Sequence, residues 1–136
     1  METPHTGGCA CGAVRYECTA EPLMAGNCHC RDCQRFSGTA YAAGLFVPAS
    51  GFRFTKGEPK YHRSTSDSGQ QVARGFCAEC GSPVVATQAD FPMVIIYAAS
   101  LDDPTRYRPT MDIFTASAQP WDHMDPALPK YPRRPG

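Results

Sequence analysis

The chain has 136 residues, of which 42% are hydrophobic and 19% are charged, a composition typical of a folded globular domain. Its 13 lysines and arginines balance 13 aspartates and glutamates, so the formal net charge is zero. This balance argues against nucleic acid as a partner, because nucleic-acid binding usually requires a basic face, but it allows a local pocket for a small anion. No apolar run approaches the length of a membrane span, so no membrane partner is expected.

The length fits one domain with a modest core, and we expect a single domain over residues 1–136. The first dozen residues lack the basic and apolar regions of a signal peptide. We therefore expect a cytoplasmic protein. In that reducing compartment, clustered cysteines indicate metal ligands rather than disulfides.

Short segments rich in β-branched and aromatic residues recur between turn signals. We expect strands at residues 13–18, 40–47, 52–54, 72–76, 84–87, 93–99 and 112–115. In the first of these, Val14, Tyr16 and Cys18 alternate with more polar residues, the period of a half-buried strand. No segment of about a dozen residues shows a helical period, although one or two helical turns can follow Cys30. The pattern predicts a mainly β fold of antiparallel strands.

The C-terminal stretch 119–136 contains five prolines and cannot form regular structure for long. We expect an extended arm that is pinned by its apolar side chains, Trp121, Leu128 and Tyr131.

The eight cysteines are grouped along the chain. They are Cys9 and Cys11, then Cys18, then Cys28, Cys30 and Cys33, and finally Cys77 and Cys80. The outer two pairs are each followed by glycine, which lets the chain turn tightly so that two thiolates can converge on one ion. Two such pairs would complete a closed zinc site with four ligands, and this site would contribute directly to folding.

The middle run CHCRDC offers three thiolates, one fewer than a closed zinc site needs. A fourth position open to water or substrate is typical of catalytic zinc. His29 lies between two of these cysteines, and we expect it to point away, because alternate residues share a direction within such a knuckle. Cys18 has no neighbouring ligand and is expected to be a small core residue. A different grouping, with Cys9 and Cys11 joined to two middle cysteines, is not excluded by spacing.

Several motifs together resemble the glutathione-dependent formaldehyde-activating enzymes and their centromere-protein-V-like relatives. The motifs are GGCACGAVRYE, CHCRDCQRFSG, GEPKYHRS, RGFCAECGSPV, SLDDP, QPW and LPKY, and they span Gly7 to about Pro132. The resemblance implies the β-tent fold, in which curled antiparallel sheets are built around zinc knuckles.

Position by position, the resemblance implies two zinc ions per chain. It makes Cys9, Cys11, Cys77 and Cys80 the ligands of a structural zinc. It makes Cys28, Cys30 and Cys33 the ligands of a catalytic zinc.

The family reaction joins formaldehyde to the thiol of glutathione and is classed with the carbon–sulfur lyases. The resemblance therefore implies a small thiol such as glutathione and a small aldehyde as substrates. Glutathione carries two carboxylates, which arginine can bind bidentately. The candidates are Arg31, Arg35, Arg63 and Arg74. We prefer Arg35 and Arg74, which flank the cysteines, together with Gln34 from the run CQRFSG.

Three further residues bear on the shape of the pocket, and the first two have two interpretations each. Phe36 can line a pocket or belong to the core. Trp121 can cover the pocket or pin the arm. Asp112 stands where family members often have histidine before IF, and a contact with the pocket there would alter substrate preference.

Two other functions compete with the lyase. A non-catalytic module could bind glutathione or a protein partner through a structural zinc fold. A redox enzyme of similar fold would need a reactive cysteine outside the metal sites, and only Cys18 remains for that role.

Overall fold

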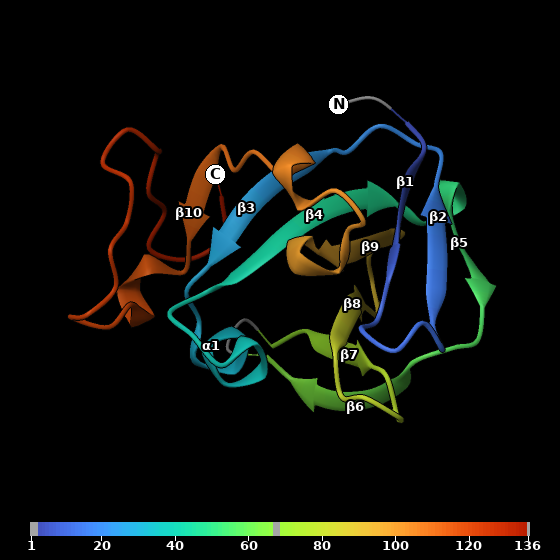
Figure 1. Ribbon diagram of the computed structural model, residues 1–136. Coiled ribbons are helices and arrows are strands. Elements are labelled where there is room, and N and C mark those ends of the chain that lie inside the picture. The colour runs from blue at the N-terminus through green and yellow to red at the C-terminus, as the bar shows by residue number, and fades with distance from the viewer. Residues whose placement is uncertain (1–2, 67–68, 136) are drawn as a thin grey trace.

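The computed structural model describes residues 3–66 and 69–135, which form ten strands, one α-helix and four short 3₁₀ helices (Figure 1). The strands are β1 (His5–Gly8), β2 (Arg15–Cys18), β3 (Met24–Cys28), β4 (Ala42–Pro48), β5 (Phe52–Lys56), β6 (Lys60–Thr65), β7 (Gln71–Phe76), β8 (Pro83–Gln88), β9 (Met93–Tyr97) and β10 (Met111–Ile113). The helices are α1 (Arg31–Ser37), η1 (Ala49–Gly51), η2 (Ala98–Ser100), η3 (Pro104–Arg106) and η4 (Thr115–Ser117). In the described residues no helix is long and apolar enough to cross a membrane.

The strands form two sheets. The smaller sheet has the order β1-β2-β5, and the larger one has the order β10-β3-β4-β9-β8-β7-β6. Neighbouring strands in these sheets are antiparallel except for β10 and β3, which run parallel. The mainly β, antiparallel fold expected from the sequence is therefore confirmed, with a single parallel pair where the chain returns near its C-terminal end.

The two faces of the larger sheet have different partners, because side chains alternate along each strand. From β4, Leu45 and Val47 are fully buried in the core that the larger sheet shares with β2. Ala42, Gly44 and Phe46 alternate with these residues and face a cavity. On β2, Tyr16 and Cys18 are buried in the same core. Cys18 is thus a core residue, as expected from its position in the sequence away from the other cysteines.

Helix α1 is held by its two ends. Cys30 precedes the helix, and its Sγ accepts a hydrogen bond from the backbone N–H of Cys33 at 3.3 Å. Gly38 ends the helix in the left-handed conformation, with φ of 76°, and its N–H donates to the Gln34 carbonyl. The short helix expected after Cys30 is therefore present, and it holds two of the three middle cysteines at its start.

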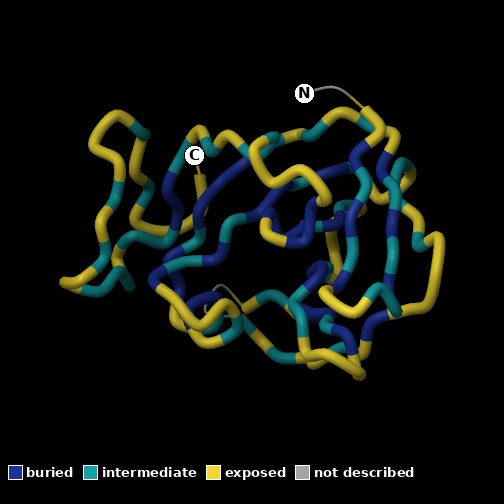
Figure 2. Tube along the Cα trace, viewed as in Figure 1, coloured by how far each residue is buried: buried dark blue, intermediate teal, exposed yellow. Residues whose placement is uncertain are grey.

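The C-terminal arm returns along β10 through backbone hydrogen bonds. The N–H of Tyr131 donates to the Asp112 carbonyl at 2.9 Å, and the N–H of Phe114 donates to the Arg133 carbonyl at 2.9 Å. Figure 2 shows that the stretch preceding this return is mostly at the surface. Trp121 belongs to it and is 60% exposed. The expectation that Trp121 pins the arm is therefore wrong, because backbone pairing and polar side-chain contacts of Asp122 and Lys130 hold the arm.

Candidate metal centres and the adjoining cavity

The outer cysteine pairs meet at one point of the fold. The Sγ atoms of Cys9, Cys11, Cys77 and Cys80 all lie within 4.8 Å of one another. Two of these residues are buried and two are exposed, so the cluster lies at the edge of the core. It joins the β1–β2 turn to the β7–β8 turn, two segments that are far apart in the sequence.

The local backbone explains why each pair converges. Gly12 and Gly81 have φ of 81° and 79°, in the left-handed region that glycine adopts readily. The N–H of Gly81 donates to the Cys77 carbonyl at 2.8 Å, which closes the turn around the pair. The N–H of Glu79 also donates to Cys77 Sγ, at 3.4 Å. Such turns hold two thiols on the same side of the chain.

The middle cysteines form a second, separate cluster. Cys28 ends β3, Cys30 precedes α1 and Cys33 lies in its first turn, and their Sγ atoms lie within 4.8 Å of one another. No outer cysteine belongs to this group. The structure thus divides the seven thiols as the family resemblance implies, and not in the other grouping that spacing left open.

Hydrogen bonds among the thiols of the second cluster shift the pKa values of Cys28 and Cys30 in opposite directions. Hydrogen bonds from Cys28 and Cys33 lower the pKa of Cys30 far below its usual value. Hydrogen bonding to Cys30 and Cys33 raises the pKa of Cys28, because a second thiolate there would meet like charge. The cluster therefore already stabilises a thiolate at Cys30, as a metal ligand requires.

Arg74 faces this cluster from β7. Its side chain is buried, with 6% exposed, and Nε has no hydrogen-bond partner among the described residues. Burial alone would lower the pKa of Arg74, but its interactions with the neighbouring Cys33 and Tyr97 outweigh this effect, so the pKa is raised overall. A buried guanidinium next to clustered thiolates offsets their charge and also offers a donor to a ligand.

His29 points away from the thiols. It is fully buried, its Nε2 lies 2.8 Å from Asp112 Oδ1, and its Nδ1 lies 2.5 Å from Asp122 Oδ2. Asp112 also accepts a hydrogen bond from Lys130 Nζ at 3.0 Å. Burial alone would raise the pKa of Asp112, but the bonds from His29 and Lys130 lower it overall. These contacts link β3 to the C-terminal arm.

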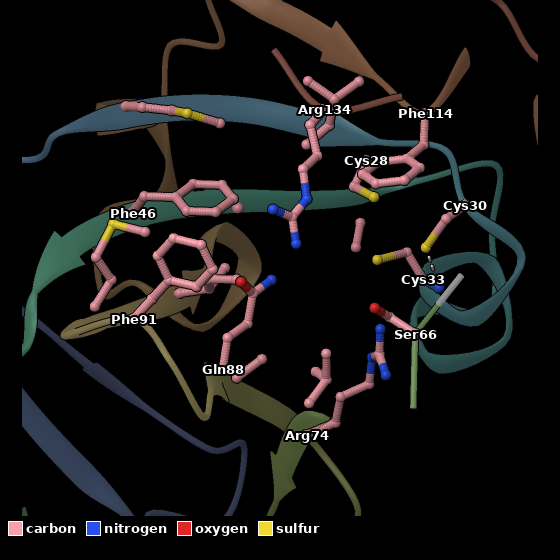
Figure 3. Close-up of a pocket in the computed structure, with 18 of the residues that line it drawn as sticks. Cys28, Cys30, Cys33, Phe46, Ser66, Arg74, Gln88, Phe91, Phe114 and Arg134 are labelled. Carbon is pink, nitrogen blue, oxygen red and sulfur yellow. Dashed lines mark hydrogen bonds between the residues drawn. The ribbon is translucent and has the colours of Figure 1, made fainter. Parts of the chain in front are cut away.

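The three-thiol cluster opens onto a cavity of about 320 Å³ on the face of the larger sheet away from the shared core (Figure 3). The figure shows Cys28, Cys30 and Cys33 at one end and Phe46 and Phe91 at the other. The lining residues are Met24, Cys28, Cys30, Cys33, Ala42, Gly44, Phe46, Ser66, Val72, Arg74, Ala86, Gln88, Phe91, Met93, Ile95, Tyr97, Ile113, Phe114, Arg134 and Pro135. The four-thiol cluster does not line this cavity.

Two of the three substrate contacts expected from the sequence lie elsewhere. Gln34 is buried, but its amide nitrogen donates to the backbone carbonyls of His29, at 2.7 Å, and Ser117, at 3.0 Å. Arg35 is exposed on α1. Neither lines the cavity, because α1 turns only its cysteine-bearing side toward it. Of the expected contacts, Arg74 alone faces the cavity.

The remaining sequence candidates are also outside the cavity. Arg31 donates to the Gln34 side chain at 2.6 Å, and Arg63 stacks on Tyr61 at 5.8 Å. Phe36 packs against Tyr97, with ring centroids 5.3 Å apart, and so belongs to the packed interior. Trp121 and Asp112 do not line the cavity either, so neither acts as its cover or wall.

Sequence reasoning missed most of the cavity wall. The alternation along 40–47 and 93–99 could have identified Phe46 and Ile95 as residues on the face opposite the core. Arg134 gave no such signal. It reaches the cavity only because the arm returns along β10, and its guanidinium lies 5.7 Å from the centre of the Phe91 ring.

The fold is a mainly β domain with two cysteine clusters, of four and three thiols, that could each hold a metal ion. The sequence model of the glutathione-dependent formaldehyde-activating enzymes matches residues 4–117, and the chain belongs to this family. The fold is also similar to the crystal structure of a protein from Rhodobacter sphaeroides, with a TM-score of 0.55 and 24% sequence identity. That similarity covers 71% of this chain and 87% of the other.

Proposed function

We propose that the protein is a zinc-dependent carbon–sulfur lyase that joins or cleaves the adduct of a small thiol and an aldehyde, similar to S-(hydroxymethyl)glutathione synthase. One observation carries the proposal: in a member of this family, the three-thiol cluster opens onto a cavity and the four-thiol cluster does not. Glutathione and formaldehyde are the substrates that the family description suggests.

The residues present fit zinc. Thiolates are preferred zinc ligands, and each cluster gathers its Sγ atoms within 4.8 Å. Cys9, Cys11, Cys77 and Cys80 would complete a closed structural site, whereas Cys28, Cys30 and Cys33 would leave one position for the substrate. Bound zinc would lower the pKa of a substrate thiol and polarise a carbonyl group. A reducing compartment such as the cytoplasm would keep all seven thiols available.

The chain's own residues would balance the charge of the site and exclude water from it. Three thiolates exceed the charge of one divalent ion, and the buried Arg74 guanidinium compensates for the excess. In the forward direction the substrate sulfur attacks the aldehyde carbon, a C–S bond forms, and the carbonyl oxygen receives the proton that the thiol has lost. The apolar cavity wall limits competing attack by water.

Metal analysis combined with matched cysteine variants tests the proposal. We expect about two zinc ions per chain in the wild type and about one in a folded Cys30→Ser variant. Cys80→Ser should instead lower the thermal stability sharply. Cys18→Ala removes a cysteine outside both clusters and should keep both ions.

Turnover is measured by NMR as exchange between formaldehyde, glutathione and their adduct. Wild type and Cys18→Ala should accelerate this exchange, and Cys30→Ser should not. If Cys30→Ser retains two ions and full turnover, the assignment of the open centre is wrong. If glutathione binds but no thiol and aldehyde pair is turned over, the non-catalytic binding module is the correct function.

A further inference from the structure

The cavity has a second end that is built for an apolar group. Five apolar side chains form this end, which we call the apolar chamber: Met24, Phe46, Phe91, Met93 and Ile95. Met24 is registered opposite Phe46 across β3 and β4, and Phe46 is registered opposite Ile95 across β4 and β9. These three residues form a continuous apolar row across the sheet.

The chamber is well separated from the thiols but continuous with them. Met24 lies four residues before Cys28 on β3, so the two are about 13 Å apart at about 3.3 Å per residue. Ala42, Gly44 and Ala86 line the cavity as well and have little or no side chain. These small residues form part of the wall between the two ends, and the Arg134 guanidinium enters the cavity beside the chamber, 5.7 Å from the centre of the Phe91 ring (Figure 3).

Neither substrate suggested by the family description fills this chamber. Formaldehyde has no substituent to place there. Glutathione is charged at both ends and has no terminal alkyl chain to place there.

We propose that the apolar chamber binds the alkyl chain of a straight-chain aldehyde, so that the preferred aldehyde is of medium chain length and not formaldehyde. This inference rests on the proposed function and specifies its substrate class. The balance of the reaction is unchanged: the thiol sulfur bonds to the aldehyde carbon, the carbonyl π bond opens, and the oxygen gains the thiol proton. The product is an S-(1-hydroxyalkyl) thioether.

The expected effect follows from apolar burial. Each methylene group that leaves water for the chamber raises affinity about fourfold. Affinity therefore rises steadily with chain length until the chamber is full and then levels off.

The first experiment measures binding without turnover. Isothermal titration with 1-propanol, 1-butanol, 1-hexanol and 1-octanol uses chains that cannot form the adduct. Wild type should show the fourfold increment per methylene. Met24→Ser should reduce this increment, and so should Phe91→Ser, whose site is partly exposed and contributes little to the folded core. Leu23→Ser is the matched control, because Leu23 adjoins Met24 but is 61% exposed and does not line the cavity.

The second experiment measures exchange with glutathione and aldehydes from formaldehyde to octanal. In wild type, kcat/KM should be higher for hexanal than for formaldehyde. This preference should be reduced in Met24→Ser and retained in Leu23→Ser, and that result supports the inference. Turnover of formaldehyde with no chain-length effect in either experiment overturns the inference and leaves the proposed function intact. A chain-length effect in alcohol binding with no turnover of any aldehyde overturns the proposed function, and with it the aldehyde as occupant.

Discussion

The contact between Lys130 and Asp112 should determine how firmly the C-terminal arm is held. Lys130 Nζ donates to the buried Asp112 carboxylate at 3.0 Å and to the carbonyls of Asp125, at 2.6 Å, and Leu128, at 3.0 Å. Lys130→Met keeps most of the aliphatic chain and removes all three hydrogen bonds. The perturbation therefore isolates the ammonium group.

The magnitude follows from burial. A hydrogen bond to a charged group contributes about 1.5–3 kcal/mol when buried. The Lys130 side chain is 34% exposed, and Asp112 keeps its bond from His29, so water and the remaining partner offset part of the loss. We expect a loss of about 1–2 kcal/mol in the free energy of unfolding after this discount for exposure.

Thermal unfolding followed by circular dichroism is the assay. For a chain of this size, about 1 kcal/mol lowers Tm by about 3–5 °C, so Lys130→Met should unfold about 3–10 °C below wild type. Trypsin should also cleave the arm of the variant faster after Arg133. Arg133→Met is the control, because Arg133 is exposed and bonds to β10 through its backbone carbonyl, which the substitution keeps. A Tm equal to that of Arg133→Met would refute the reasoning.

Two further predictions concern the placement of side chains outside the cavity. Gln34→Leu removes the two hydrogen bonds that the Gln34 amide donates to backbone carbonyls, and it should lower the free energy of unfolding, measured with urea, by about 2–3 kcal/mol. Arg35→Ala, on the exposed side of α1, should change stability and turnover little. A large loss of turnover in Arg35→Ala alone would show that Arg35 does contact the substrate. The hydrogen bond from Arg15 lowers the pKa of Asp102 below its usual 3.8, so the stabilisation by this pair is fully present above pH 3.8 and is lost as the pH falls through the lowered pKa. Asp102→Asn should therefore be less stable than wild type by a constant amount from about pH 5 to 7, and a difference that grows on acidification from pH 5 would contradict this sign.

The strands that the sequence predicted are those with a clear two-residue period or a buried apolar run. All seven expected segments overlap observed strands, from β2 to β10. The missed strands are β1, β3 and β6. β1 and β3 contain glycine, and β3 also contains Asn27, residues that usually weaken a strand prediction. β6 is an edge strand with mostly exposed side chains, so it carries no apolar pattern.

By itself the sequence determined that seven cysteines form pairs and a run with metal-ligand spacing, because this spacing and the glycines that follow each outer pair are local properties of the chain. Spacing left open how they divide into two clusters, and the tertiary structure decided that division. The sequence also determined that His29 points away from the thiols and that Cys18 lies in the core. Only the tertiary structure decided what surrounds the three-thiol cluster. Arg74 faces the thiols because the larger sheet brings β7 into register with its neighbours, and Arg134 reaches the cavity because the arm pairs with β10. The apolar chamber arises from side chains on separate strands and loops, which no local spacing can align.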